Sequence, residues 1–262
     1  MKRILLSLTA LVCALDLHAG VVYRFESVTE GLTTQTFAGT VKAEQGNVRI
    51  DVASGDGMFF GDGSIVLSPA GSGKVTVIDP AKRTFYELDL SNLFGRATGA
   101  LSQFKDLVKV DAKNTRVAVR DAGPAGMMLS YPVRRSHVTS SFDLILNVFG
   151  EKTPARVEIN TDAWTTDKFP AEIANVFQTS TLRSGIDAID KLIDSQTSSI
   201  RGFPLKQVTT TRVTMRGSNT LSMTTSNVTS IRQSPIAPAE FAMPSDYRKV
   251  DNPVDALMKR LK

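Results

Sequence analysis

The chain has 262 residues, of which 42% are hydrophobic and 22% are charged. This composition can build a packed core and excludes an intrinsically disordered chain. The formal net charge is +5 and the basic residues are dispersed, which argues against a nucleic-acid-binding protein, because such proteins gather basic residues in a stripe.

Residues 1–19 have the layout of a secretory signal peptide. Lys2 and Arg3 precede a short apolar run, Ile4 to Leu15, and this run is too short to span a bilayer stably. We expect cleavage after Ala19 and a periplasmic or secreted mature protein. No later segment is apolar for long enough to be a transmembrane span.

Cys13 is the only cysteine of the chain. A lipoprotein signal built on Cys13 is an alternative, although Val12 is not the small residue that such a signal requires. Cleavage after the signal would leave no disulfide and no thiolate metal site, so the fold must be held by its core alone.

Five short stretches after the signal alternate apolar and polar residues, as a strand with one dry face does. Residues typical of turns separate several of them, so we expect a β-meander. The stretches are VVYRFESV (21–28), NVRIDV (47–52), SIVLS (64–68), KVTVID (74–79) and TFYELDL (84–90).

The segment GDGMFFGDGS contains two Asp-Gly pairs, Asp56-Gly57 and Asp62-Gly63. A calcium loop needs acidic residues at alternate positions, and apolar residues stand there instead. The following GSGK is not a phosphate loop, since Val75 occupies the place of the required Ser or Thr. We therefore predict tight turns at both pairs.

Helical spacing of apolar residues predicts helices at 101–109 and 170–199, and a C-terminal amphipathic helix at 252–261. Asn252 is the expected N-cap of the last helix. That helix docks on its own domain or, alternatively, touches an anionic membrane.

Further strands are predicted at 115–121, 127–149 and 155–164, with a hairpin over 203–233 that turns at Gly217. Odd-numbered apolar residues of this hairpin are expected on one side of the sheet. They are Leu205, Val213, Met215, Leu221, Met223 and Ile231.

Little in the chain suggests catalysis or a cofactor. His137 is the only histidine after the signal, and a lone strand histidine is expected to be solvated or hydrogen-bonded rather than a metal ligand. The acidic residues fall on strand outer faces and turns, as Glu87, Asp143 and Glu158 do. We expect no enzyme, no metal and no cofactor; a hydrolase remains an alternative only if His137 and two acids share a cleft.

Several pieces, in this order along the chain, resemble an uncharacterised family of exported bacterial proteins that are similar in fold to the LolA/LolB lipoprotein carriers. The pieces are VYRFES, GNVRIDVASGDG, KVTVIDPAKRTFYELDL, VEINTDAWTTD, GFPLKQV and FAMPSDYRKVD. The resemblance implies a strongly curved, open antiparallel sheet with helices covering its concave face, in a space that accepts acyl chains in the carriers.

Together, these patterns predict one α+β domain over residues 20–262, with a large antiparallel sheet shaped as an open half-barrel. An apolar groove left under an imperfect helical cover would bind a lipid-like ligand. The candidate lining is Tyr23, Phe25, Ile50, Tyr86, Leu88 and Met215, with plain core packing as the alternative for all six.

The function that we expect is a non-enzymatic periplasmic binding or carrier protein for a lipid-like or apolar ligand. The alternative is a structural or interaction protein of the bacterial cell envelope, which would hold a protein partner by strand edges or helix faces.

Overall fold

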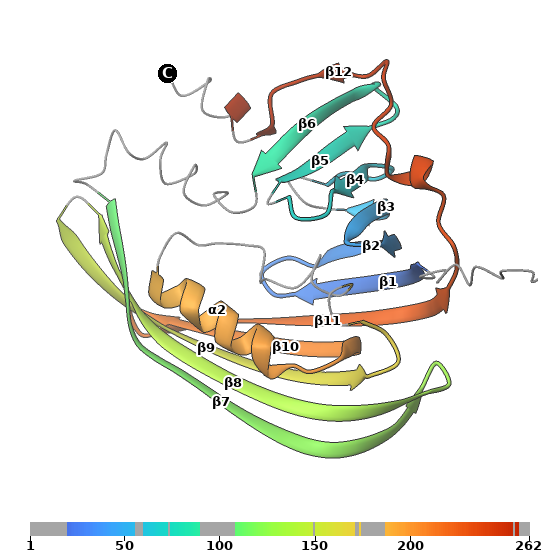
Figure 1. Ribbon diagram of the computed structural model, residues 1–262. Helices are drawn as coiled ribbons and strands as arrows, with labels where there is room; N and C mark the ends of the chain where they lie inside the picture. Colours follow the sequence, from blue (N-terminus) through green and yellow to red (C-terminus); the bar gives the residue numbers. More distant parts are fainter. Residues whose placement is uncertain are drawn as a thin grey trace, which may run out of the picture.

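A computed structural model of the chain shows one strongly curved sheet (Figure 1). Its strands follow the order β12-β6-β5-β4-β3-β2-β1-β11-β10-β9-β8-β7. The structure describes residues 20–55, 60–72, 74–89, 108–148, 150–170, 173, 187–253 and 255–256. No helix in these described ranges is both long and apolar enough to cross a bilayer.

Six short strands form one half of the sheet, as the alternation predicts for five of them. They are β1 (Val21–Glu30), β2 (Gln35–Glu44), β3 (Asn47–Gly55), β4 (Ile65–Ser68), β5 (Lys74–Asp79) and β6 (Thr84–Asp89). Neighbouring strands pair antiparallel, so this half is the expected meander. Of the two Asp-Gly pairs, Asp62-Gly63 lies in a turn with Gly63 at φ +74°, and Asp56-Gly57 lies outside the described residues.

Five longer strands form the other half, and three smaller elements accompany them. The long strands are β7 (Val108–Met128), β8 (Tyr131–Val148), β9 (Glu151–Thr166), β10 (Phe203–Met215) and β11 (Ser218–Gln233). The smaller elements are the helix α2 (Asp187–Ser199), the 3-10 turn η5 (Pro238–Phe241) and the two-residue strand β12 (Arg248–Lys249). β11 pairs with β1 and joins the two halves.

The predicted fold class is wrong in two respects. The sheet is mixed rather than wholly antiparallel, because β12 pairs parallel to β6. In the described part of the chain α2 is the one extended helix; it lies over the long strands, and the predicted set of helices covering the concave face is not found there. Residues 101–107 lie outside the described residues. Val108 and Lys109 belong to β7, since Val-Lys-Val alternates and its β-branched residues favour a strand.

The helix predicted at 170–199 is observed only from Asp187 onward; of the earlier positions, the structure describes 170 and 173. In the tail, the Asn252 Oδ1 atom accepts a hydrogen bond from the Asp255 amide at 2.9 Å. This contact confirms the predicted N-cap, and residues 254 and 257–261 of the predicted tail helix lie outside the described residues.

One face of the sheet, called the inner face here, carries α2. Leu192 of α2 packs with Phe142 of β8 and Val157 of β9. Val157 pairs with Val213 of β10, and alternation continues this face across β11 and β1. In Figure 1, α2 lies within the curve formed by the long strands.

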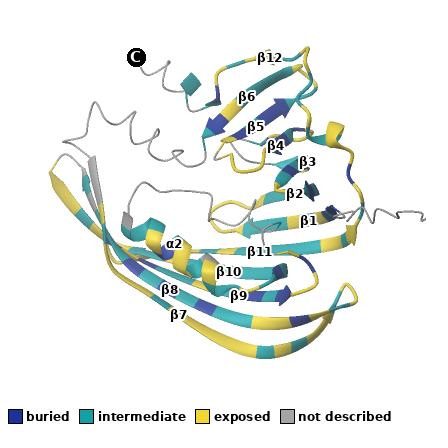
Figure 2. Cartoon of the chain, in the orientation of Figure 1, coloured by how far each residue is buried: buried dark blue, intermediate teal, exposed yellow. Residues whose placement is uncertain are grey.

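The main core lies on the same face of the short strands. The register aligns Tyr23, Val41, Ile50, Val66 and Val77 from strand to strand. All five are buried, with Val41 at 0% exposure, and they belong to one hydrophobic cluster. Figure 2 shows buried residues in β3–β5 and also in parts of β8 and β9, with exposed residues recurring along β7.

The C-terminal segment crosses the opposite, outer face of the short strands. The Glu240 carboxylate accepts a hydrogen bond from Lys42 Nζ at 2.9 Å, and the Glu240 carbonyl accepts one from Arg49 at 3.0 Å. Arg49 is also paired with Asp51 at 2.7 Å. These contacts hold η5 against β2 and β3, and the chain then continues to β12.

The hairpin β10–β11 corrects one sequence prediction. Val213 pairs with Thr220 and Arg212 pairs with Leu221, so Leu221 lies on the face opposite to Val213. The expectation that all six odd-numbered apolar residues share a side is therefore wrong. Leu221 and Met223 lie on the outer face, where they are 53% and 39% exposed.

Candidate functional site

A cavity of about 370 Å³ opens on the inner face where the two halves of the sheet meet. We call it the junction groove. Four strands, β1, β2, β10 and β11, supply its walls. Its lining consists of Tyr23, Phe25, Ser27, Phe37, Phe203, Pro204, Leu205, Gln207, Thr209, Thr224, Ser226, Asn227 and Val228.

One end of the junction groove is built from aromatic rings. Tyr23 and Phe203 meet edge to face with centroids 5.2 Å apart, and Phe25 and Phe37 lie 5.2 Å apart. Phe203 and Leu205 are each 1% exposed. Pairs of rings at these separations contribute stability beyond their buried area, so this end is a firm apolar wall.

Gly39 leaves room for the Phe25 ring. It pairs with Phe25 across β1 and β2, and a Cβ at this position would come 3.3 Å from Cε1 of Phe25 and 2.6 Å from the Asp51 carbonyl oxygen. Any larger residue would press on the backbone of β3. The glycine therefore lets the ring lie along β2 toward Phe37.

The other end of the junction groove is lined by hydroxyl groups. The side chains of Ser27 and Ser226 are hydrogen-bonded at 2.8 Å, and those of Thr29 and Thr224 at 2.9 Å. The Thr209 hydroxyl bonds to Thr161 of β9 at 3.1 Å. These are direct cross-strand pairs, so the hydroxyl row is a consequence of the register.

The lining named above contains no aspartate, glutamate, lysine, arginine or histidine. Its one titratable side chain is Tyr23, and burial raises the pKa of that phenol far above its usual value. The groove therefore offers aromatic, aliphatic, hydroxyl and amide groups, all neutral at physiological pH.

The six residues predicted as groove lining occupy three places. Tyr23 and Phe25 line the junction groove. Ile50 and Leu88 are 3% and 2% exposed in the adjoining core, and Tyr86 packs against that core with its pKa raised to about 12, mainly by burial and also by Asp79. Met215 is 41% exposed at the end of β10.

Sequence reasoning missed Phe37, Phe203 and the hydroxyl row. Phe203, Leu205, Gln207 and Thr209 follow one another at every second position, and this period-two pattern was the available signal. Phe37 stands in a stretch rich in small residues, and the sequence carries no comparable signal for it.

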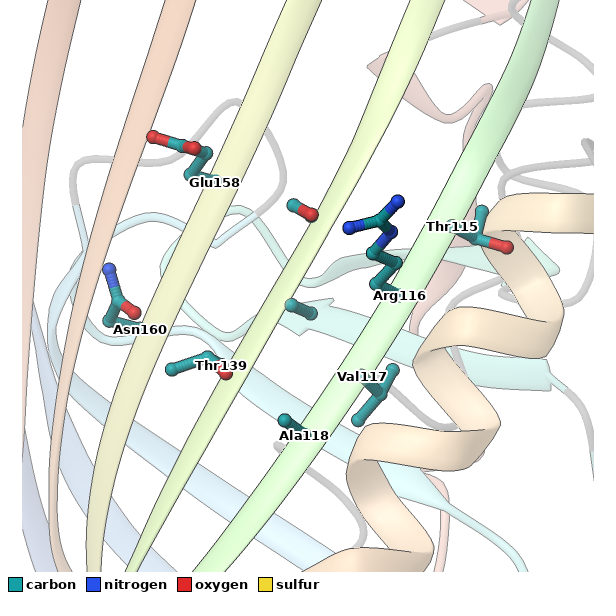
Figure 3. A pocket seen from close by; sticks show the side chains of 9 residues that line it. Thr115, Arg116, Val117, Ala118, Thr139, Glu158 and Asn160 are labelled. Carbon is teal, nitrogen blue, oxygen red and sulfur yellow. The ribbon is translucent and has the colours of Figure 1, made fainter.

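A second hollow of about 740 Å³ lies over β7, β8 and β9. Figure 3 shows Arg116, Thr139, Glu158 and Asn160 extending from these neighbouring strands. Glu158 accepts a hydrogen bond from Arg156 at 3.3 Å. This hollow is polar, so it lacks the dry surface that would hold an apolar ligand.

His137 lies in a charged group on the long strands. Its Nδ1 atom is 3.2 Å from an Asp162 carboxylate oxygen, and the same oxygen is 2.9 Å from Arg135. Arg135 also lies over the Trp164 ring, 4.9 Å from its centroid. Of the two states expected for His137, solvated or hydrogen-bonded, the structure shows the hydrogen-bonded one.

No family model and no curated protein matches the chain. Several solved structures are similar at low identity. An uncharacterised conserved protein from Thermus thermophilus is 9% identical, with 89% of this chain and 91% of that chain covered and a TM-score of 0.37. A LolA superfamily protein from Nitrosomonas europaea is 8% identical, with 86% and 91% covered and a TM-score of 0.34.

The third structure is the MucA/MucB complex of Pseudomonas aeruginosa, at 9% identity, with 84% of this chain and 95% of that chain covered and a TM-score of 0.23. A LolA superfamily protein is thus among the solved structures that are similar to this chain. At these identities and TM-scores, the likeness carries no argument about what the chain binds.

Proposed function

We propose that the protein is a non-enzymatic binding or carrier protein that acts in the periplasm after export and holds the apolar part of a lipid-like ligand in the junction groove. The observation that carries this proposal is the neutral lining of that groove, one end of which is built from aromatic and aliphatic side chains. Its volume of about 370 Å³ lies within the range of small-molecule sites, roughly 300–1,000 Å³.

Non-covalent binding of an apolar ligand is the activity that this lining supports best. An apolar chain that leaves water for such a wall gains roughly 25 cal/mol per Å² of buried apolar surface, and it needs no reacting group. Tyr23 keeps its proton because burial raises the pKa of its phenol. The lining therefore offers no ready general base, which supports a role without covalent chemistry.

Filling the groove tests this function. Thr224 and Thr225 are neighbours on β11 with side chains on opposite faces, and Thr224 lines the groove. The probe is N-phenyl-1-naphthylamine, an uncharged fluorophore whose emission rises in apolar surroundings. We expect Thr224→Trp to weaken probe binding by at least about tenfold, which corresponds to about 1.4 kcal/mol.

The matched control is Thr225→Trp, which adds the same ring to the outer face and is expected to leave probe binding unchanged. Circular dichroism of both variants checks that they fold. A wild-type protein that does not bind the probe, or a Thr224→Trp variant that binds it as the wild type does, would refute the carrier proposal.

An envelope interaction protein is the second candidate, and the position of β7 favours it. β7 has 21 residues and ends the strand order, and Val119 and Met127 on it are 46% and 64% exposed. A terminal strand can pair with an extended segment of a partner. Cross-linking in cells would then yield one stoichiometric protein partner, and Val119→Lys would abolish its capture.

A further inference from the structure

The junction groove has two chemically different ends, and together they define the kind of molecule that fits. The ring of Phe25 and the hydroxyl of Ser27 are two residues apart on β1 and share the inner face. Successive residues of one face are separated by roughly 7 Å. An elongated ligand along β1 would therefore pass from an apolar wall to a polar one within a few bond lengths.

The polar end has unused hydrogen-bonding capacity of both kinds. A hydroxyl provides one donor and two acceptor lone pairs. The Ser27–Ser226 and Thr29–Thr224 pairs each use one donor and one lone pair on each other. Each pair keeps one donor and several lone pairs, and the Gln207 amide beside them adds both functions.

The register keeps charged side chains of these strands away from the groove. Glu26 precedes Ser27 and Lys206 precedes Gln207, and alternation turns both toward the outer face. Lys206 pairs with Trp164 of β9, the two side chains share the face opposite to Gln207, and the Lys206 Nζ atom lies 5.2 Å from the centroid of the Trp164 ring. A carboxylate or phosphate in the groove would meet no counter-charge from the lining, and burying it would cost free energy.

We propose that the junction groove selects amphiphiles with an uncharged, hydrogen-bonding head, such as acylglycerols or acyl glycosides, over amphiphiles with an anionic head on the same chain. The aromatic end holds the chain, and the hydroxyl row with Gln207 binds the head. This inference rests on the carrier function proposed above and adds the class of ligand.

Competition for the bound naphthylamine probe tests the selectivity. Monolauroylglycerol and laurate carry the same acyl chain, and both are added below their micelle concentrations at about pH 8, where the fatty acid is ionised. We expect the glycerol ester to displace the probe at a concentration at least about tenfold lower than laurate does.

A positive charge placed in the groove should reverse the order of the concentrations at which the two amphiphiles displace the probe. Ser226→Lys puts a cation beside the head position, and we expect it to bring laurate to a lower displacing concentration than the glycerol ester. Thr225→Lys carries the same charge on the outer face and should retain the wild-type order.

The two proposals fail in different ways. Equal displacement by the two amphiphiles, including no displacement by either, or a wild-type preference for laurate, overturns the selectivity. In each of these cases, binding of the probe itself still supports the groove as an apolar site. If the probe does not bind the wild-type protein, the carrier function is lost along with the selectivity.

Discussion

The short strands β1–β6 and the long strands β7–β11 share one sheet, but different contacts stabilise them. In the short half, the cross-strand row from Tyr23 to Val77 is buried in one extended cluster. In the long half, the described residues of the cluster under α2 include three buried members, Phe142, Val157 and Leu192. Val133 of β8 and Phe203 and Leu205 of β10 join the core of the short half, and surface pairs such as Arg156–Asp143, at 2.9 Å, add to the backbone ladders.

This difference between the two halves explains where the candidate binding site lies. The short half buries its inner face in its own core, whereas the long half leaves much of its inner face polar and half-exposed, with Thr and Ser side chains. The junction groove lies where one type of surface gives way to the other. Its two chemical ends therefore follow from the contrast between the halves.

The largest decrease in the free energy of unfolding is expected for a substitution in the core of the short half. Ile50 is 3% exposed, and Ile50→Ala removes buried methyl groups and leaves a cavity, which lowers the free energy of unfolding by about 2–4 kcal/mol. Urea denaturation followed by circular dichroism measures it. The control is Val119→Ala, at a position 46% exposed on β7, which should lower the free energy of unfolding by less than about 1 kcal/mol. Similar losses in both variants would contradict the contrast between the two halves of the sheet.

The second largest loss of stability is expected to be confined to the long half. Leu192→Ala removes the buried residue of α2 from its small cluster, and we expect a local loss of about 2 kcal/mol. Hydrogen exchange should quicken in α2 and β7–β10 and remain unchanged in β1–β6. The neighbouring Lys191→Ala, at an exposed position, is the control, and faster exchange in β3–β5 would show that the halves are not separable.

The sequence predicts the short half well because its alternation is regular. Strands β3 to β6 coincide closely with the predicted stretches. β2 was not predicted, since it begins with Gln35 and Thr36 and carries Gly39 in its middle, and a glycine inside a strand weakens the pattern. A Cβ at Gly39 would come 2.6 Å from the Asp51 carbonyl oxygen of β3 and 3.3 Å from the Phe25 ring of β1, and only the folded structure places these neighbours there.

The long half is harder to predict because one of its turns lacks the usual residues. The strand predicted over 127–149 is interrupted at Leu129 and Ser130, which adopt φ +48° and +67°; neither residue type is typical of that conformation. β7 and β8 meet at this turn as a hairpin.

In this half, odd or even residue numbers also fail to predict the face of the sheet on which a side chain lies. The turn of the β10–β11 hairpin has two residues, Arg216 and Gly217, both at positive φ. A two-residue turn pairs odd positions of one strand with even positions of the other, as Met215 with Ser218. Near this turn, odd-numbered residues of the two strands therefore face opposite sides of the sheet, whereas the bulge farther along β11 returns Ile231 to the face of Tyr23.

Only part of the candidate site could be predicted from the sequence. Tyr23 and Phe25 could be predicted because β1 alternates clearly. Phe203 could not be joined to them, since β10 reaches the groove through the pairing of β1 with β11 and of β11 with β10. That adjacency depends on strand order, which a single sequence does not contain.

The smallest effect is expected at the edge of the short half, where β12 is held to β6. The Glu87 carboxylate accepts a hydrogen bond from Lys249 Nζ at 2.6 Å, and this bond lowers the pKa of Glu87. Because these side chains are 46% and 58% exposed, we expect Lys249→Met to lower the free energy of unfolding by less than about 1 kcal/mol at neutral pH.

The sign of the pH dependence is fixed by the direction of that shift. A carboxyl group with a lower pKa in the folded protein stabilises the fold above its unfolded pKa, about 4.3, and this stabilisation is lost as the pH falls through the folded pKa. The difference between wild type and Lys249→Met should therefore shrink on acidification from about pH 5 to below the lowered pKa of Glu87. Arg248→Met, at the adjacent residue of β12, is the control, and a difference between wild type and Lys249→Met that persists in acid would assign the role of Lys249 to packing rather than to charge.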